Sequence, residues 1–141
     1  MLRVLVLFLL ISLAGCYATG STFAESPAPP ATSEPIAYFY RQPGYFGGWI
    51  PSGIFIDGKR VDWMGQKGFT WIVLAAGAHE IGASWGDSRP EVGLATLINP
   101  GKQYFRLSTH AVNGGNEIRI DQVPEAVALE EMKNFRYSPH K

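Results

Sequence analysis

The sequence has little charge and only one cysteine. Charged residues make up 17% of its 141 residues, and the 12 lysines and arginines equal the 12 aspartates and glutamates. Because a nucleic-acid-binding protein needs a basic surface against the phosphates, this neutral balance argues against that class. With Cys16 as the sole cysteine, an intramolecular disulfide is excluded and a cysteine-based zinc site is not expected. Aromatic residues, at 13%, argue against a disordered chain.

Motifs for cofactor binding and catalysis are also missing. There is neither a Walker phosphate-binding loop nor a G-x-G-x-x-G fingerprint. The histidines, His79, His110 and His140, are far apart and have no second ligand at metal-binding spacing. Residues 82–86 (GASWG) match the G-x-S-x-G pattern of hydrolases, but they lack the strand-to-helix context that this pattern requires. We therefore expect a protein that has no cofactor or metal and is not an enzyme.

The N-terminus has the pattern of a secretory signal. Arg3 precedes an apolar run of about ten residues, which is too short to span a bilayer. Residues 13–16 (LAGC) follow, with small residues before the cysteine. This pattern resembles the bacterial lipobox, and the resemblance implies cleavage before Cys16 and acylation of its thiol. The alternative is an ordinary signal peptide cut nearby, for example after Ala18 or Ala24.

The resemblance also implies a location. Tyr17 follows the cysteine, where an aspartate would tend to retain a lipoprotein at the inner membrane. We therefore expect a lipid anchor in the bacterial outer membrane, with the domain facing the periplasm. Residues 1–15 are then the signal peptide, and residues 16–35 are the lipidated cysteine and a flexible tether rich in Ser, Thr, Ala and Pro. Such a tether would reach about 60 Å as a polyproline II helix and about 25 Å as a coil.

Residues 36–137 read as short strands separated by turns. Asp57 and Gly58 between two apolar runs predict a tight hairpin, because both turn positions need a positive φ. Pro100 followed by Gly101 predicts a type II turn. Apolar residues at helical spacing predict one short helix over 124–136, before a tail at 138–141. The sequence therefore predicts a mainly β fold: an antiparallel β-sandwich of about seven or eight strands with one short C-terminal helix. The expected strands are 36–41, 54–56, 61–63, 69–74, 79–85, 92–98, 104–109 and 117–122.

Several short motifs occur in a specific order along this region. They are AYFYR at 37–41, IFIDGK at 54–59, GFT at 68–70, AAGAHEI at 75–81 and IRIDQVP at 118–124. In this order they resemble the bacterial DUF2846 family, a lipoprotein-associated domain of unknown function, over about residues 36–136. The middle segment also resembles PEGA-like sandwich domains, where a Pro-Gly-x-His turn joins two strands; Ala76 stands here in place of that proline. The resemblance implies no catalytic residues.

The strongest candidate for ligand binding is the glycine-rich loop at residues 45–50 (YFGGWI). Its aromatic side chains, Tyr45, Phe46 and Trp49, could stack on sugars or hold apolar groups of a partner. The alternative is that Trp49 and Ile50 fold back and close one end of the sandwich. Nothing in the loop distinguishes a glycan from a protein as the ligand.

Among the histidines, His79 is the strongest candidate for chemistry. Strand periodicity places it on the same face as Ile81 and Ala83, so we expect a structural side chain that donates a hydrogen bond to a turn carbonyl. No acid or nucleophile is expected within its reach, whereas a polar pocket around His79 or His110 would indicate an enzyme. The predicted function is a lipid-anchored envelope module that binds or supports without catalysis. The alternatives are an envelope glycan-binding module and an uncharacterised envelope enzyme.

Overall fold

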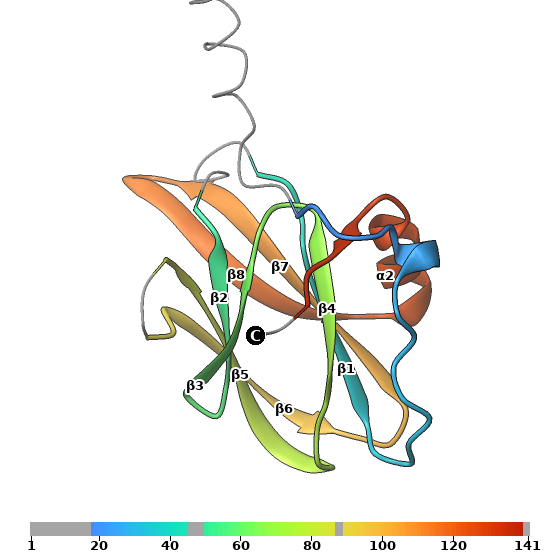
Figure 1. Cartoon of the computed structure of the whole chain (residues 1–141). Coiled ribbons are helices and arrows are strands. Elements are labelled where there is room, and N and C mark those ends of the chain that lie inside the picture. The colour runs from blue at the N-terminus through green and yellow to red at the C-terminus, as the bar shows by residue number, and fades with distance from the viewer. Residues whose placement is uncertain (1–17, 45–49, 87–88, 140–141) are drawn as a thin grey trace, which may run out of the picture.

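The computed structural model describes residues 18–44, 50–86 and 89–139, and this part of the chain forms two sheets packed face to face (Figure 1). The five-stranded sheet has the order β8-β7-β1-β4-β9, and the four-stranded sheet has the order β3-β2-β5-β6. The predicted mainly β sandwich with one short helix is confirmed. Its elements are η1 (Phe23–Glu25), β1 (Ile36–Arg41), β2 (Ser52–Ile56), β3 (Lys59–Met64), β4 (Gly68–Val73), β5 (Gly77–Trp85), β6 (Val92–Ile98), β7 (Lys102–Val112), β8 (Gly115–Val123), α2 (Glu125–Met132) and β9 (Arg136–Tyr137).

Two strand pairs run parallel, while the other pairs are antiparallel as expected. β1 pairs with β7 in parallel, and β4 pairs with β9 in the same way. The predicted turn at Pro100 and Gly101 explains the first pair. Gly101 has a φ of 102°, and its carbonyl accepts a hydrogen bond of 2.9 Å from the N–H of Ile36. β7 therefore starts beside the start of β1, and the two strands run in the same direction.

The main core lies between the two sheets. Phe39 of β1 and Phe105 of β7 stack with ring centroids 5.2 Å apart. Ile54 of β2 and Ile81 of β5 belong to the same buried cluster. Burial of these alternate side chains removes apolar surface from water and holds the sheets together.

The outer face of the five-stranded sheet is covered as well. Tyr38 and Tyr40 alternate with Phe39 along β1 and pack in a second cluster, in which Ala128 and Met132 of α2 are fully buried. β1 is therefore apolar on both faces, which is why its sequence does not show the usual alternation of apolar and polar residues.

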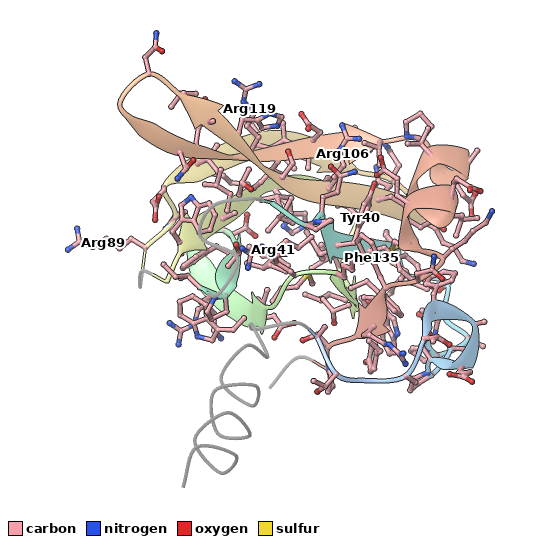
Figure 2. All side chains as sticks on the ribbon, turned by 90° about the horizontal axis from the view of Figure 1, so that it is seen from above. Tyr40, Arg41, Arg89, Arg106, Arg119 and Phe135 are labelled. Carbon is pink, nitrogen blue, oxygen red and sulfur yellow. The ribbon has the colours of Figure 1, made fainter. Side chains whose placement is uncertain are left out.

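Polar contacts also fix α2 on this sheet, as Figure 2 shows around Tyr40, Arg106 and Phe135. The carboxylate of Glu131 accepts a hydrogen bond from the Tyr40 hydroxyl and forms an ion pair of 3.0 Å with Arg106. The helix ends at Met132, earlier than the predicted residue 136, and Phe135 packs edge-on against Tyr40.

The predicted hairpin between β2 and β3 is confirmed. Ile56 lies opposite Lys59, and the two residues between them have positive φ, 52° at Asp57 and 76° at Gly58. These are the signs that a type I′ turn requires.

The segment that was predicted as a flexible tether needs correction in its described part, residues 18–35. The ring of Phe23 lies 5.1 Å from that of Phe69, and the Trp71 indole donates a hydrogen bond to the carbonyl of Pro27. Further on, the N–H of Leu74 donates to the carbonyl of Pro35. The segment thus follows β4 from its start to its end, along the side of the domain (Figure 1).

Candidate functional site: a groove beside the loop end

One end of the sandwich includes the β1–β2 and β3–β4 connections. We call their described residues, 42–44, 50–51 and 65–67, the loop end. The buried side chain of Arg41 joins the two sheets there. Its Nη1 donates hydrogen bonds to the carbonyls of Ile50 (2.7 Å) and Met64 (3.0 Å), and its guanidinium lies 5.3 Å from the ring centre of Trp85. Figure 2 shows Arg41 inside the molecule, whereas Arg89 points away from it. A buried guanidinium needs such acceptors, and it fixes the chain that supplies them.

Gln66 holds the loop end from the other side. Its buried side-chain amide donates a hydrogen bond of 3.1 Å to the carbonyl of Gly44, and the backbone carbonyl of Gln66 accepts one of 3.1 Å from the N–H of Ala18. Gly44, which precedes the predicted binding loop, and Ile50, which ends it, are therefore held by side chains of the domain.

The residues on which the sequence-based site predictions depend lie outside the described part of the structure. This applies to the predicted lipidation site, Cys16, and to the predicted ligand-binding residues, Tyr45, Phe46 and Trp49. These assignments stay predictions.

A groove opens beside the loop end, between the edge strands β3 and β9. It consists of a cavity of about 440 Å³ and a second cavity of about 510 Å³, which share Ser138 and Pro139 in their walls. The first is lined by Arg60, Asp62 and Trp63 of β3. The second is lined by residues 18–20 and by Pro51, Gly65 and Tyr137.

The chemistry of the groove is mixed. The Arg60 guanidinium lies 4.6 Å from the ring centre of Trp63, in cation–π geometry. Asp62 is 7% exposed, and its Oδ1 accepts a hydrogen bond of 2.7 Å from the N–H of Trp63. The cation and the indole on this wall can hold a small polar ligand or an extended chain, whereas the Asp62 carboxylate is buried. These side chains do not form a nucleophile with its base. This wall has no signal in the sequence, because its residues have the pattern of an ordinary strand after the hairpin.

His79 lies at the opposite end of the sandwich. Its Nδ1 is 2.7 Å from Oδ2 of Asp57, and its Nε2 is 3.0 Å from the carbonyl oxygen of Ala75. The predicted position on the face of Ile81 is confirmed, because the side chain of His79 is only 16% exposed. The predicted hydrogen bond to a turn carbonyl, that of Ala75, is confirmed as well. The expectation that no acid lies within reach was wrong. Asp57 was assigned to its own turn, but that turn also brings its carboxylate against β5.

The partners of His79 determine its protonation. A carboxylate and a carbonyl only accept hydrogen bonds, so the arrangement favours the form of His79 in which both ring nitrogens carry protons. The hydrogen bond to Asp57 is the main cause that raises the pKa of His79 above its usual value, although partial desolvation opposes this. Hydrogen bonds from the N–H of Glu80 and from His79 lower the pKa of Asp57. A protonated imidazole cannot act as a general base.

The other candidate residues for catalysis do not form a triad. Ser108 Oγ lies 3.0 Å from His110 Nε2, on one face of β7. Glu117 lies opposite His110, but its carboxylate pairs with Arg119, which is the main cause of the lowered pKa of Glu117. Ser84, the serine of the hydrolase-like pattern, is fully buried inside strand β5. It therefore does not stand at the strand-to-helix turn that the pattern requires.

Within residues 18–44, 50–86 and 89–139, no group of three or more His, Cys, Asp or Glu side chains gathers that could hold a metal ion. No helix in the same ranges is long and apolar enough to cross a bilayer.

Comparisons with protein-family models, with curated proteins and with solved structures found no match to this chain. The resemblance to the DUF2846 family therefore stays a prediction from the motifs.

Proposed function

We propose that this chain is a lipid-anchored module of the bacterial cell envelope, of the kind that the DUF2846 resemblance implies. It is held in the outer membrane by acyl chains on Cys16 and faces the periplasm, where it binds or supports a partner without catalysis. The observation that carries the proposal is the position of the sole cysteine, directly after residues 13–15 (LAG) and an apolar run of signal-peptide type.

The packing of the N-terminal segment supports cleavage before Cys16. Ala18 is hydrogen-bonded to Gln66, and Phe23 packs on Phe69. A cut after Ala24, as in the alternative of an ordinary signal peptide, would remove both contacts from the mature domain. A cut before Cys16 leaves every described residue in place.

The arrangement of polar groups supports a binding or structural role. The side chain of His79 joins two turns, and the groove wall at Arg60, Asp62 and Trp63 offers contacts without a nucleophile. An envelope glycan is a second candidate ligand. It is favoured by the Trp63 indole in the groove wall, because an aromatic face can stack on a sugar ring.

Exchange of the cysteine tests the proposal. Cells that express the full chain are labelled with palmitate and fractionated, and we expect label in the membrane-bound protein. Cys16→Ser should carry no label and should either leave the membrane fraction or accumulate as uncut precursor, because serine offers no thiol for acylation.

A matched control separates lipobox acylation from adventitious modification of a thiol. Cys16→Ser combined with Ser21→Cys restores one thiol five residues downstream, and this variant should also remain unlabelled. Labelling and membrane retention of Cys16→Ser equal to those of the unmodified chain would refute the proposal.

A further inference from the structure

The N-terminal segment is attached to the domain from its first described residue. Besides the bond between Ala18 and Gln66, the carbonyl of Ser21 accepts a hydrogen bond of 2.8 Å from the N–H of Tyr137, and Thr22 forms a β-bridge with Arg136. Gly20 packs so closely that a Cβ there would lie 1.9 Å from the carbonyl oxygen of Tyr137. Several independent contacts thus hold residues 18–22 against β9 and the loop end.

The proline-rich run that follows does not separate the domain from its anchor. The run starts at η1, near the start of β4. The carbonyl of Pro27 accepts a hydrogen bond from the Trp71 indole, and the carbonyl of Pro35 accepts one from the N–H of Leu74, next to the end of β4. The run therefore extends along the side of the sandwich, from the loop end to the opposite end, and adds no distance between the domain and Cys16.

Only a short piece of chain remains between the acylated residue and the domain. Ala18 follows Cys16 by two residues, which span at most about 7 Å when fully extended. The acyl chains must be inserted in the bilayer, so Ala18 and its partner Gln66 are held close to the headgroups.

We propose that the loop end of the sandwich lies against the lipid headgroups of the leaflet that holds the acyl chains. This inference rests on the proposed function, because it takes the acyl chains on Cys16 as given. The occupant of the surface is the bilayer itself, and the domain does not stand off at the end of a tether.

Basic side chains lie at and beside the loop end, and acidic ones lie in neighbouring parts of the same end, Glu91 before β6 and Glu117 near the start of β8. Lys67 is exposed and directly follows Gln66. Arg136 is also exposed, and its Nη1 lies 3.5 Å from the carbonyl oxygen of Gly20. Residues 42–44, 50–51 and 65–67 contain no acidic side chain. Basic side chains beside a lipid anchor provide the second signal that strengthens membrane attachment.

The proposed orientation also determines where the groove lies relative to the membrane. Its second cavity is lined by residues 18–20, Pro51 and Gly65, so it opens next to the membrane surface. A partner bound in the groove would therefore be one that is itself at the membrane surface.

Two lysines provide a matched test of this orientation. Lys59 starts β3 at the hairpin and Lys67 follows its end, so the two exposed side chains lie about 20 Å apart along the strand direction. Lys67→Cys and Lys59→Cys are made separately in the full lipidated chain, where Cys16 is blocked by its acyl group. Each new thiol is labelled with a fluorophore, and the protein is reconstituted in vesicles that contain headgroup spin-labelled lipid. We expect the label at residue 67 to be quenched several-fold more strongly than the label at residue 59.

A longer and flexible connection between Cys16 and Ala18 provides the control. A flexible Gly/Ser insert of about ten residues between Tyr17 and Ala18 should lower quenching at residue 67 toward the level at residue 59. The same insert between Ala31 and Thr32, exposed residues that follow the contacts of residues 18–22, should leave quenching unchanged.

The outcomes separate this inference from the proposed function. Acylation is first measured by intact mass, and a chain without acyl groups contradicts both. An acylated, vesicle-bound chain with equal quenching at the two labels, or with quenching at residue 67 unaffected by the insert after Tyr17, overturns the orientation alone.

Discussion

The ring of His79 lies between two hydrogen-bond acceptors, Asp57 and Ala75, at the end of the sandwich opposite the loop end. The Asp57 carboxylate also accepts a hydrogen bond from the N–H of Glu80. One ion pair thus joins the β2–β3 turn, the start of β5 and the turn before it. The pair is partly exposed to solvent, so its contribution to stability is small compared with that of the core.

The pH dependence of unfolding follows from this pair. The pKa of His79 is raised above 6.5 by folding, so its contribution is complete below that pH and is lost as pH rises through the folded pKa. The pKa of Asp57 is lowered below 3.8, so its contribution is complete above that pH and is lost as pH falls through the folded pKa. We expect the pair to stabilise the domain fully between these two values.

Urea unfolding of the chain from Tyr17 onward, with and without His79→Gln, measures this effect. Between about pH 5.5 and pH 8.5 the unmodified protein should lose more unfolding free energy than His79→Gln, because glutamine has no proton to release. The same loss in both proteins would show that His79 is not held as an imidazolium.

The sequence pattern predicted the position of His79 and one of its two hydrogen-bond partners. Strand periodicity placed His79 on the face of Ile81, and the tight turn supplied its carbonyl partner. The pairing with Asp57 could not be predicted, because the two residues lie 22 positions apart and meet only when β2 and β5 pair.

At the scale of elements, the β2–β3 hairpin depends on backbone conformation. Gly58 has a φ of 76°, and a Cβ added to it would meet nothing within 4 Å. Gly58→Val therefore causes no clash, and its cost comes from the left-handed backbone alone. We expect it to lower the unfolding free energy by more than about 1 kcal/mol in a denaturant titration.

Gly115→Val is the matched control for this variant. Gly115 also has open space around its Cβ position, but its φ lies outside the left-handed region. Its stability should be unchanged or slightly higher, because valine suits a strand. An equal loss in both variants would contradict the turn-strain explanation.

Elements with strong local signals were predictable, and elements held by distant partners were not. Asp57 and Gly58 specify their turn wherever they occur between strands. Phe23, by contrast, is a single large apolar residue in a run of small residues and prolines, so composition indicated a tether. Its place on Phe69 depends on the outer face of the sheet, which no local pattern encodes.

The architecture of the whole molecule was predictable only at the level of class. Strand periodicity indicated a sandwich, but the parallel pairing of β1 with β7 joins residues 66 positions apart, such as Ile36 and Lys102. The groove wall at Arg60, Asp62 and Trp63 arises from the meeting of β3 with the chain after β9, and it has no sequence motif.

The position of the anchor determines how the whole molecule relates to the membrane. The described chain is packed on the domain from Ala18 onward, so acylation at Cys16 would bring the loop end and the groove to the bilayer surface. Cleavage after Ala18 or Ala24 would instead give a domain without an anchor, and cleavage after Ala24 would also remove Phe23 from the cluster on the outer face of the five-stranded sheet.

The most direct test is the mass of the N-terminal peptide of the mature protein, purified from membranes and digested. We predict that this peptide begins at Cys16 and carries the mass of a diacylglyceryl group on its thiol, with or without a further acyl chain on its amino group. A mature N-terminus after Ala18 or Ala24, or an unmodified Cys16, would contradict the account of this protein as a lipid-anchored envelope module.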